Sequence, residues 1–403
     1  MINRAEKLEH VHSDIRGPLY TESQRMIKEG HSVLRLNTGN PATFGFAMPQ
    51  SVKNALLNNA DKAVGYCDLK GMPDAREAIC KYHLSKGIEG ITPDDIYIGN
   101  GVSELVSMAL TALLNSGDEI LMPAPSYSLW SNCAYIAGGK PVFYTCDESS
   151  LWYPDIADIK KKVTNKTRAI VIINPNNPTG ATYPKEILEQ IIEVAREHDL
   201  IIFSDEIYDR LTMDGVEHIS TASLCPDRMV ITMNGLSKSH VVCGFRCGWM
   251  VISGAKGKAE DYLDGIFQLA AMRLCSNALT QVVIPAALED DASTRAMMTP
   301  GGRIYEQREA TIRELEKIEG ISCVKNTAAF YVFPKLDIKK FNITDDKKFA
   351  FDLLHEKKIF IVPGSGFDWQ QPDHFRIVML PEPDILAQAI RDIGDFLKTY
   401  RQN

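Results

Sequence analysis

Lys238 stands in a setting that suits covalent chemistry. It ends the segment Asn-Gly-Leu-Ser-Lys, residues 234–238, which directly follows an apolar stretch of strand length at 229–233. Burial lowers the pKa of an amine, and a neutral amine can attack a carbonyl carbon to form a Schiff base. Most lysines are only solvated surface groups. The role of Lys238 therefore depends on the polar residues that end neighbouring strands.

Two further polar residues follow apolar stretches in the same way. Asp205 follows the stretch 200–204, and a carboxylate there is costly to bury unless a cation, such as a protonated ring nitrogen, pairs with it. Capping of a helix N-terminus is the alternative role for Asp205. Asn177 lies in a proline-rich loop after the stretch 169–173. A stiff turn explains the prolines of this loop but leaves Asn177 without a role.

Three other segments suit anions. Residues 99–104 follow one strand pattern and open a helical one, so their backbone N–H groups can hold a phosphate, with a simple strand-to-helix turn as the alternative. A dinucleotide-binding fingerprint requires a third glycine where Glu104 stands. Arg246 adds a fixed cation suited to phosphate. Arg376, inside an apolar strand pattern, needs an anionic partner, which is either a substrate carboxylate or an internal acidic residue.

Alternating strand and helix patterns must position these residues. Apolar runs of strand length occur at 95–98, 119–122, 141–144, 169–173, 200–204, 229–233 and 249–252. Helical spacing of apolar residues occupies gaps at 103–114 and 185–198. This alternation predicts a largely parallel sheet covered on both faces, and such sheets bind ligands at the carboxyl ends of their strands. We therefore expect Asn177, Asp205 and Lys238 to lie together.

From about Arg303 onward, the sequence pattern predicts a long charged helix followed by short strands. The short strand patterns lie at 321–325, 328–333, 360–362 and 375–379, with a helix near 347–357. This texture predicts a second, smaller α+β unit. We predict an N-terminal arm at 1–45 that joins the small domain, a large domain at 46–300 and a small domain at 301–403.

The composition narrows the function class. The chain has 403 residues, 45% of them hydrophobic and 24% charged, with a formal net charge of −8. This balance is typical of a globular protein, and the acidic charge disfavours nucleic acid and anionic membranes as partners. The nine cysteines are scattered and never spaced C-x-x-C, which disfavours structural zinc and a disulfide framework. Without a long apolar segment, we expect a cytoplasmic protein and no metal site.

Together these segments resemble the fold type I, class I and II aminotransferases, which use pyridoxal 5′-phosphate (PLP). The resemblance covers essentially the whole chain and rests on order and spacing. It is carried by Tyr66 with Gly71, Gly101 to Ser103, Tyr127, Asn177, Asp205 with Tyr208, Lys238 with Arg246, and Arg376. It implies the α/β fold of the PLP-dependent transferases of fold type I: a large domain with a mostly parallel seven-stranded sheet, plus a smaller α+β domain.

The resemblance also implies a role for each catalytic residue. Lys238 holds PLP covalently and moves a proton between the substrate Cα and the cofactor C4′. Asp205 pairs with the protonated pyridine nitrogen, which keeps the ring an electron sink. Asn177 and Tyr208 donate hydrogen bonds to the ring O3′, and Tyr127 stacks on the ring face.

The resemblance also implies residues that bind the phosphate of PLP and the α-carboxylate of the substrate. The implied phosphate site consists of Gly101, Val102, Ser103, Ser237 and Arg246. Tyr66 reaches this phosphate from a neighbouring subunit, so the resemblance implies a homodimer with shared active sites. Arg376, with Asn177 and the backbone of Gly39, holds the substrate α-carboxylate.

Within the family, the chain is most similar to the bacterial alanine aminotransferases. The stretches that carry this likeness are 14–18, 36–46, 65–68, 98–105 and 300–303. It implies ping-pong transfer of an amino group between L-alanine and 2-oxoglutarate, giving pyruvate and glutamate. We assign Arg16, on the arm, to the distal carboxylate of glutamate as a hypothesis. Residues 328–331, Ala-Ala-Phe-Tyr, replace a turn that usually contains glycine, which affects the expected substrate preference.

Parts of the sequence are compatible with other functions. The same residues suit an aminotransferase that prefers aspartate, aromatic or branched-chain substrates, or a PLP-dependent β-lyase. A nicotinamide dehydrogenase rests on residues 99–104 alone and gives Lys238, Asp205 and Asn177 no role. A regulator or scaffold without catalysis has no need of Lys238 or Arg376, and the arm is too short for a DNA-binding extension.

Overall fold

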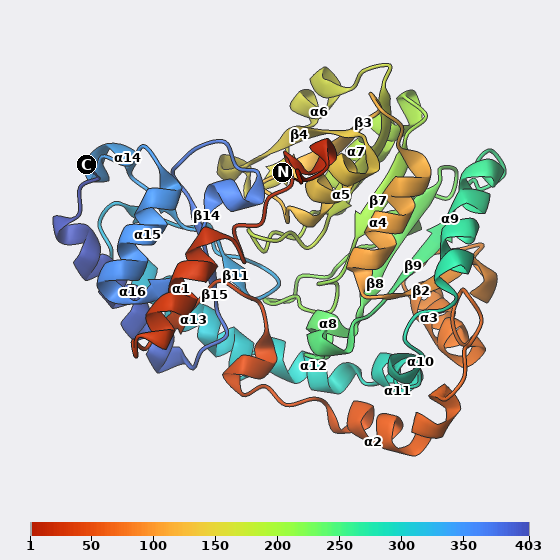
Figure 1. The fold of residues 1–403 in the computed structure, drawn as a ribbon, viewed down its shortest axis with the longest axis horizontal. Helices are drawn as coiled ribbons and strands as arrows, with labels where there is room; N and C mark the ends of the chain where they lie inside the picture. Colours follow the sequence, from red (N-terminus) through yellow and green to blue (C-terminus); the bar gives the residue numbers. More distant parts are fainter. Residues whose placement is uncertain (1, 403) are drawn as a thin grey trace.

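The computed structural model describes residues 2–402, which form a larger part around one sheet and a smaller part beside it (Figure 1). The main sheet has eight strands in the order β2-β9-β8-β7-β6-β3-β4-β5. They are β2 (Ile96–Asn100), β3 (Glu119–Ala124), β4 (Lys140–Asp147), β5 (Tyr153–Pro154), β6 (Thr167–Ile173), β7 (Ile201–Asp205), β8 (Val230–Gly235) and β9 (Cys247–Ser253).

Most of this sheet is parallel, as predicted. Strands β4, β3, β6, β7 and β8 pair in parallel, and β9 runs antiparallel to both β8 and β2. All seven predicted strands are present. The eighth, β5, pairs antiparallel with the end of β4. It was not predicted because a strand of two residues gives no periodic signal.

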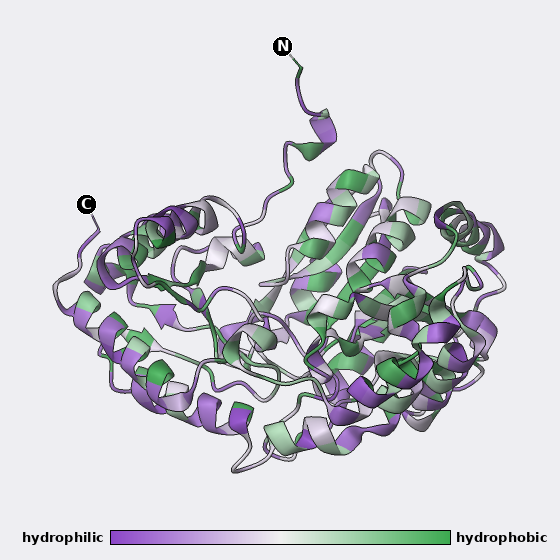
Figure 2. Ribbon diagram, turned by 60° about the horizontal axis from the view of Figure 1, so that its bottom comes forward, coloured by the Kyte–Doolittle hydropathy of each residue, from purple (hydrophilic) through white to green (hydrophobic). Residues whose placement is uncertain are grey.

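Helices cover both faces of the sheet. One face packs against α4 (Val102–Leu113), α5 (Leu129–Ala137) and α9 (Glu260–Arg273), and the other against α3 (Pro73–Ser85), α6 (Ile156–Lys162) and α7 (Lys185–Glu197). Side chains alternate along each strand, so Ile170 and Ile172 face one layer while Val171 and Ile173 face the other. Figure 2 shows the hydrophobic strands enclosed by helices of mixed hydropathy. The continuous apolar runs thus reflect burial on both faces.

The smaller part contains short strands and longer helices. A three-stranded antiparallel sheet has the order β11 (Tyr331–Val332), β15 (Phe375–Val378), β14 (Val362–Pro363). Two pairs of strands stand beside it, β1 (Leu34–Arg35) with β13 (Ile359–Phe360) and β10 (Ile321–Ser322) with β12 (Lys335–Leu336). The helices are α1 (Pro18–Lys28), α13 (Arg303–Leu315), α14 (Ile338–Phe341), α15 (Asp346–Lys357) and α16 (Pro383–Thr399).

The N-terminal segment packs with the C-terminal one. Leu19, Met26 and Leu36 belong to the same buried cluster as Leu353 and Ile393, and in Figure 1 the red helix α1 lies among the blue C-terminal helices. This packing agrees with an arm that joins a small domain. The domain boundaries themselves stay a prediction.

The other helices of the described chain are short. The remaining α-helices are α2 (Gln50–Asn59), α8 (Leu236–Ser239), α10 (Ala278–Gln281), α11 (Ile284–Glu289) and α12 (Asp291–Met298). The 3₁₀ helices are η1 (Glu6–Leu8), η2 (Pro41–Phe44), η3 (Ala60–Ala63), η4 (Pro93–Asp95), η5 (Glu148–Ser150), η6 (Thr221–Leu224), η7 (Cys243–Phe245) and η8 (Gly364–Phe367). Between residues 2 and 402, no helix has the length and apolar character needed to cross a membrane.

The loop that carries Asn177 docks onto the smaller part at Gly180. Gly180 has a φ of +67°, and its carbonyl accepts hydrogen bonds from the N–H groups of Thr327 at 3.1 Å and Ala328 at 3.0 Å. A Cβ at Gly180 would come within 2.6 Å of the Ala328 carbonyl oxygen. Both the conformation and the space therefore require glycine.

The variant Gly180→Ala should lower the free energy of unfolding by about 2–4 kcal/mol, because it adds overpacking to an unfavourable φ. Chemical denaturation at fixed pH measures the change. Gly215→Ala is the matched control, since Gly215 has a φ of +73° but open space around it; its expected loss is only about 1–2 kcal/mol. Equal losses for the two variants would contradict the steric part of this account.

Candidate active site

Three neighbouring strands end at the same edge of the main sheet. Strands β6, β7 and β8 are adjacent and parallel, with Ile173 opposite Asp205 and Asp205 opposite Met233. The backbone N–H of Asn174 donates to the carbonyl of Asp205 at 3.0 Å. The segments that carry Asn177, Asp205 and Lys238 therefore start side by side, as expected from the parallel pattern.

Lys238 is not a solvated surface lysine. It lies on the one-turn helix α8, directly after β8, and its side chain is half-buried. Its Nζ donates a hydrogen bond to the carbonyl oxygen of Gly39 at 3.0 Å and lies 5.8 Å from the ring centroid of Phe330. The structure thus brings Lys238 and Gly39, both predicted site residues, into contact.

Asp205 is buried without a charged partner. Trp130 Nε1 donates to its Oδ2 at 3.0 Å, and the backbone N–H of Ile207 donates to its Oδ1 at 3.3 Å. Across residues 2–402 it forms no ion pair, and residues 207–210 form a turn rather than a helix that Asp205 could cap. Burial raises the pKa of Asp205 to about 6, although the Trp130 hydrogen bond and the charge of Lys238 lower it. A cationic ligand group would offset the cost of burying this carboxylate.

Arg376 is also buried without a partner of opposite charge. Its Nη1 donates to Asn177 Oδ1 at 3.0 Å, and its Nη2 donates to the carbonyl of Asn37. The guanidinium lies between the rings of Tyr331 and Phe367, 4.5 and 4.6 Å from their centroids. Within the described chain its Nε has no hydrogen-bond partner and no acidic residue pairs with it, so the internal salt bridge is not observed. Burial lowers the pKa of Arg376, and a bound carboxylate would favour its charged form.

Tyr208 links the two sheets. It follows β7 in the chain, is buried, and forms a hydrogen bond between its hydroxyl and that of Tyr331 on β11 at 3.0 Å. Burial raises the pKa of Tyr208, so the hydroxyl keeps its proton at neutral pH and can donate it in a hydrogen bond.

A second cationic position lies at the start of α4. Gly101 is the N-cap of this helix with a φ of +83°, and a Cβ there would collide with the guanidinium of Arg246. Val102 and Ser103 form the first turn of α4 and are half-buried. Arg246 is exposed and donates from Nη1 to the carbonyl of Cys243 at 3.0 Å. A helix N-terminus beside a guanidinium favours an anion such as phosphate.

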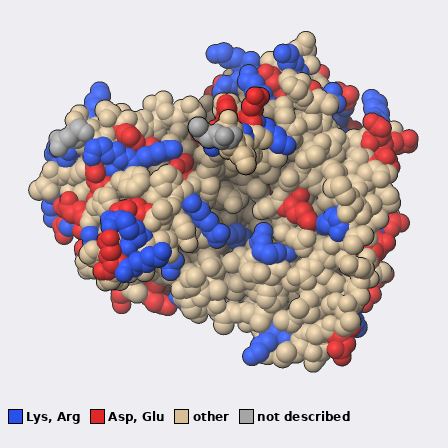
Figure 3. Space-filling model, viewed as in Figure 1, with Lys and Arg blue, Asp and Glu red and all other residues tan. Residues whose placement is uncertain are grey.

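Three further predicted site residues are Tyr127, Ser237 and Arg16. Tyr127 is half-buried after β3, and Ser237 is buried on α8. Arg16 is exposed, but the carbonyl of its neighbour Ile15 accepts from Asn37 Nδ2 at 3.0 Å, and Asn37 in turn contacts the arginine on β15. Figure 3 shows Lys and Arg side chains along the edge of a hollow between the two parts of the molecule.

Tyr66 lies apart from the site of its own chain. Its side chain is 84% exposed, and no hydrogen bond joins it to another residue within 2–402. Its place agrees with a residue that acts on a second copy of the chain, which we consider below.

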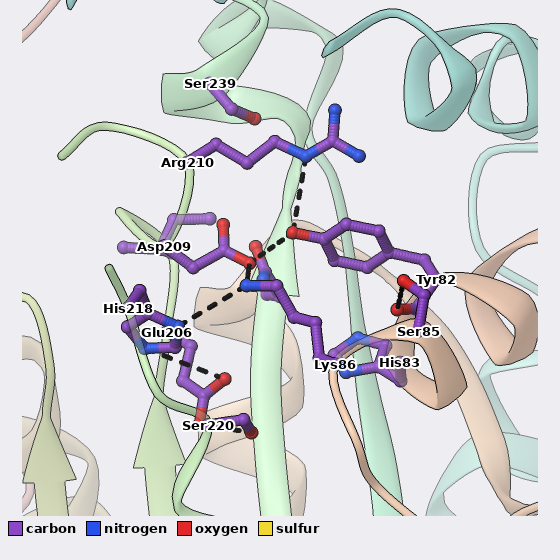
Figure 4. Close-up of polar contacts among 12 residues, drawn as sticks. Tyr82, His83, Ser85, Lys86, Glu206, Asp209, Arg210, His218, Ser220 and Ser239 are labelled. Atoms are coloured by element: carbon purple, nitrogen blue, oxygen red, sulfur yellow. Dashed lines mark hydrogen bonds and ion pairs between the residues drawn. The ribbon is translucent and has the colours of Figure 1, made fainter. Parts of the chain in front are cut away.

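A buried polar cluster lies next to the ends of β6 and β7 (Figure 4). Glu206 accepts hydrogen bonds from the hydroxyls of Ser204 and Ser220, and burial raises its pKa to about 7. Nearby, Lys86 donates to Asp209 and to His218 Nδ1, while His218 Nε2 donates to the carbonyl of Asn174 at 3.1 Å. The cluster thus fixes the backbone on which the candidate site stands.

Several residues that contact the predicted site residues were not themselves predicted. Trp130, Asn37 and Tyr331 form hydrogen bonds there, and Phe330 and Phe367 pack against Lys238 and Arg376. A buried indole N–H or phenol hydroxyl needs a polar partner, which is a general signal for Trp130 and Tyr331. The sequence contains nothing that names the partner, and Asn37 contributes a backbone carbonyl that carries no side-chain signal.

Comparisons with known proteins agree with this geometry. The family model described as aminotransferase class I and II matches residues 31–393. The chain belongs to the class I and II aminotransferases. It is 52% identical to the glutamate-pyruvate aminotransferase AlaA of Haemophilus influenzae over 399 residues, covering 99% of each chain. It is 46% identical to an alanine aminotransferase of Mycobacterium bovis, covering 99% of this chain and 93% of that one.

The fold of this aminotransferase also matches a solved structure. A crystal structure of an aminotransferase from Escherichia coli superposes with a TM-score of 0.99 at 51% identity and covers 100% of both chains. Class I and II aminotransferases are PLP-dependent enzymes. The residues of this chain fit that cofactor: Asp205 is a buried carboxylate without a cation, Lys238 supplies an amine, and Gly101 leaves space beside Arg246.

Proposed function

We propose that this aminotransferase binds PLP and transfers an amino group between L-alanine and 2-oxoglutarate, giving pyruvate and glutamate by a ping-pong mechanism. The observation that carries the substrate pair is the 52% and 46% identity, over nearly the whole chain, to proteins named glutamate-pyruvate and alanine aminotransferase. The adjacent strand ends that carry Asn177, Asp205 and Lys238, and the hydrogen bond from Arg376 to Asn177, support the chemistry.

Two residues would carry the proton and charge changes. PLP, when bound, supplies an aldehyde and an electron sink for the pair of electrons released at the substrate Cα. Lys238 would hold the cofactor through Nζ and, once displaced by substrate, move a proton between the substrate Cα and the cofactor C4′. The hydrogen bond from Lys238 Nζ to the Gly39 carbonyl would have to break when the side chain moves to carry the proton. Asp205 would hold the positive charge on the ring nitrogen.

Further side chains would orient the cofactor. Asn177 and Tyr208 would donate hydrogen bonds to the ring O3′, and Tyr127 would stack on the ring. The residues assigned to the phosphate are Gly101, Val102, Ser103, Ser237 and Arg246. The dipole of α4 and the guanidinium both favour the phosphate dianion.

The substrate α-carboxylate would bind to Arg376, with Asn177 and the Gly39 backbone beside it. The guanidinium already stands between two aromatic rings, and its Nε has no partner in the described chain. A carboxylate would supply both the missing acceptor and the missing negative charge.

A homodimer would bring Tyr66 to the phosphate site of the partner. Tyr66 is exposed together with other large apolar side chains, Val64 at 88%, Met272 at 78% and Leu274 at 54%. The amide of Gln281 donates to Cys67 Sγ and to Ser276 Oγ, which holds these two exposed segments side by side. An apolar patch of this kind suits a self-complementary interface.

The nine cysteines are all free, which suits a reducing compartment. We therefore keep the cytoplasm as the proposed location of this aminotransferase.

Absorption spectra test the proposed reaction. The cofactor-loaded protein should show a visible band that L-alanine removes and 2-oxoglutarate restores, because each substrate drives one half-reaction. Aspartate, an aromatic and a branched-chain amino acid serve as competing donors. L-cysteine, whose β-thiol can leave, tests for a β-lyase, which would release pyruvate, ammonia and sulfide in excess of one equivalent without a 2-oxo acid. A band that alanine leaves unchanged while another donor removes it would overturn the alanine assignment.

The variant Arg16→Ala should raise the KM for 2-oxoglutarate by about tenfold or more and leave the KM for alanine nearly unchanged, because only the five-carbon substrate has a distal carboxylate. Steady-state kinetics in both directions measure the two constants. Arg4→Ala, on the same arm, is the matched control and should change neither constant. An equal rise in both KM values for Arg16→Ala would refute the assignment.

A further inference from the structure

Trp130 is buried on α5 and donates its single polar hydrogen to Asp205. The distance from Nε1 to Oδ2 is 3.0 Å, and the side chain has 0% exposure. Its ring packs against Phe203 with 5.6 Å between the ring centroids. Packing therefore fixes the orientation of the indole, and the indole N–H in turn fixes one oxygen of the carboxylate.

The hydrogen bond also affects the charge of Asp205. Burial disfavours the carboxylate, whereas the donated hydrogen bond favours it. The titratable groups that face Asp205 are Lys238 on α8 and Tyr208 on its own loop. Loss of the indole donor would therefore leave Lys238 and one backbone N–H to stabilise the anion.

We propose that Trp130 is a positioning residue for Asp205: its indole N–H holds one carboxylate oxygen and keeps the group ionised, so that the carboxylate is ready for the ring nitrogen of PLP. Trp130 acts through Asp205 and not on the cofactor itself. The proposal rests on the proposed role of Asp205 toward PLP. The hydrogen bond joins two side chains of this chain, so it can be tested separately from the transamination.

The first test observes the bond directly in cofactor-free protein. The chain has four tryptophans, so a nitrogen-15 spectrum of labelled indole groups contains four signals, and the variant Trp130→Phe identifies the one from Trp130. This signal should move with a midpoint near pH 6 as Asp205 ionises. In Asp205→Asn it should stay constant over the same range. A Trp130 signal that titrates identically in Asp205→Asn would overturn the proposal.

Trp249 provides a matched control. It is 1% exposed, lies on β9, and donates Nε1 to His83 Nε2 at 2.9 Å. Burial lowers the pKa of His83 to about 3, so the Trp249 signal should not follow the midpoint near pH 6. The variant Trp249→Phe removes an indole hydrogen bond of the same kind at a distance from Asp205.

The second test measures the affinity for PLP against pH. Trp130→Phe should raise the midpoint of this pH dependence by about one to two pH units relative to wild type, whereas Trp249→Phe should not change it. An equal midpoint in the two variants would contradict the proposal. If Trp130→Phe does not fold, Phe variants of Trp152, Trp249 and Trp369 assign the Trp130 signal by elimination, and the Asp205→Asn titration then decides. If these tests fail while L-alanine still removes the visible band of the cofactor-loaded protein, the role of Trp130 is refuted and the proposed function is not.

Discussion

Replacement of Lys238 by alanine should abolish transamination and leave the fold largely intact. The substitution removes both the group that would hold the cofactor and the base that would move the proton, so we expect kcat to fall by more than about 10⁴-fold. The side chain makes one hydrogen bond, to the Gly39 carbonyl, and its loss should cost little stability. Measurement of pyruvate formation with 2-oxoglutarate gives kcat, and circular dichroism checks the fold.

Lys256→Ala is the control for this variant. Lys256 lies in the same part of the molecule and pairs with Asp95 at 2.6 Å, near the start of β2. Its replacement should leave turnover within about twofold, since partly exposed ion pairs contribute little. Near-wild-type turnover in Lys238→Ala would end the assignment of this lysine to catalysis.

Replacement of Asp205 by alanine should lower kcat by about 10²–10³-fold, because one preorganised charge next to the reacting system is lost. The ring nitrogen of PLP would lose its counter-charge, and the cofactor would withdraw electrons less strongly. We expect weaker binding of PLP as well. Stopped-flow spectra of the alanine half-reaction, recorded at saturating PLP, separate the chemical step from the loss of affinity.

The neighbouring acid Asp209 offers a contrast to Asp205. Asp209 is also buried, but it pairs with Lys86 and accepts a hydrogen bond from Tyr82, so its variant Asp209→Asn should act mainly on stability. Thermal unfolding measures that loss. An unchanged kcat in Asp205→Ala at saturating cofactor would remove the pyridine-pairing role.

Sequence patterns predicted the part of the site that depends on strand ends. Asn177, Asp205 and Lys238 each follow an apolar stretch, and parallel strands place their carboxyl ends at one edge. The main sheet could be predicted for the same reason, since its strands are long enough to show continuous apolar runs. In the smaller part, the patterns at 321–325, 328–333, 360–362 and 375–379 overlap observed strands, whereas β1 and β12, with two residues each, give too few residues for a pattern.

Contacts between distant segments could not be predicted. Trp130 and Asp205 are 75 residues apart, and Arg376 contacts a carbonyl 339 residues earlier in the chain. Ala329 has a φ of +59° in the turn that lacks glycine, which no local preference of alanine indicates. Tertiary packing determines each of these features, and propensity contributes little to them.

The residues that we propose for cofactor chemistry and the arginine that we propose for substrate binding lie at different sheets, and this separation bears on the evolution of the enzyme. Asp205 ends β7 of the main sheet and Lys238 follows β8 on α8, whereas Arg376 and Tyr331 belong to the three-stranded sheet. Hydrogen bonds between Tyr331 and Tyr208 and from Arg376 to Asn177 join the two groups. Substitutions around β11 and β15 should thus alter the accepted amino acid without moving the groups that we propose for proton transfer. New donor preferences in this lineage should arise first by mutation of the smaller part, with the cofactor chemistry inherited unchanged.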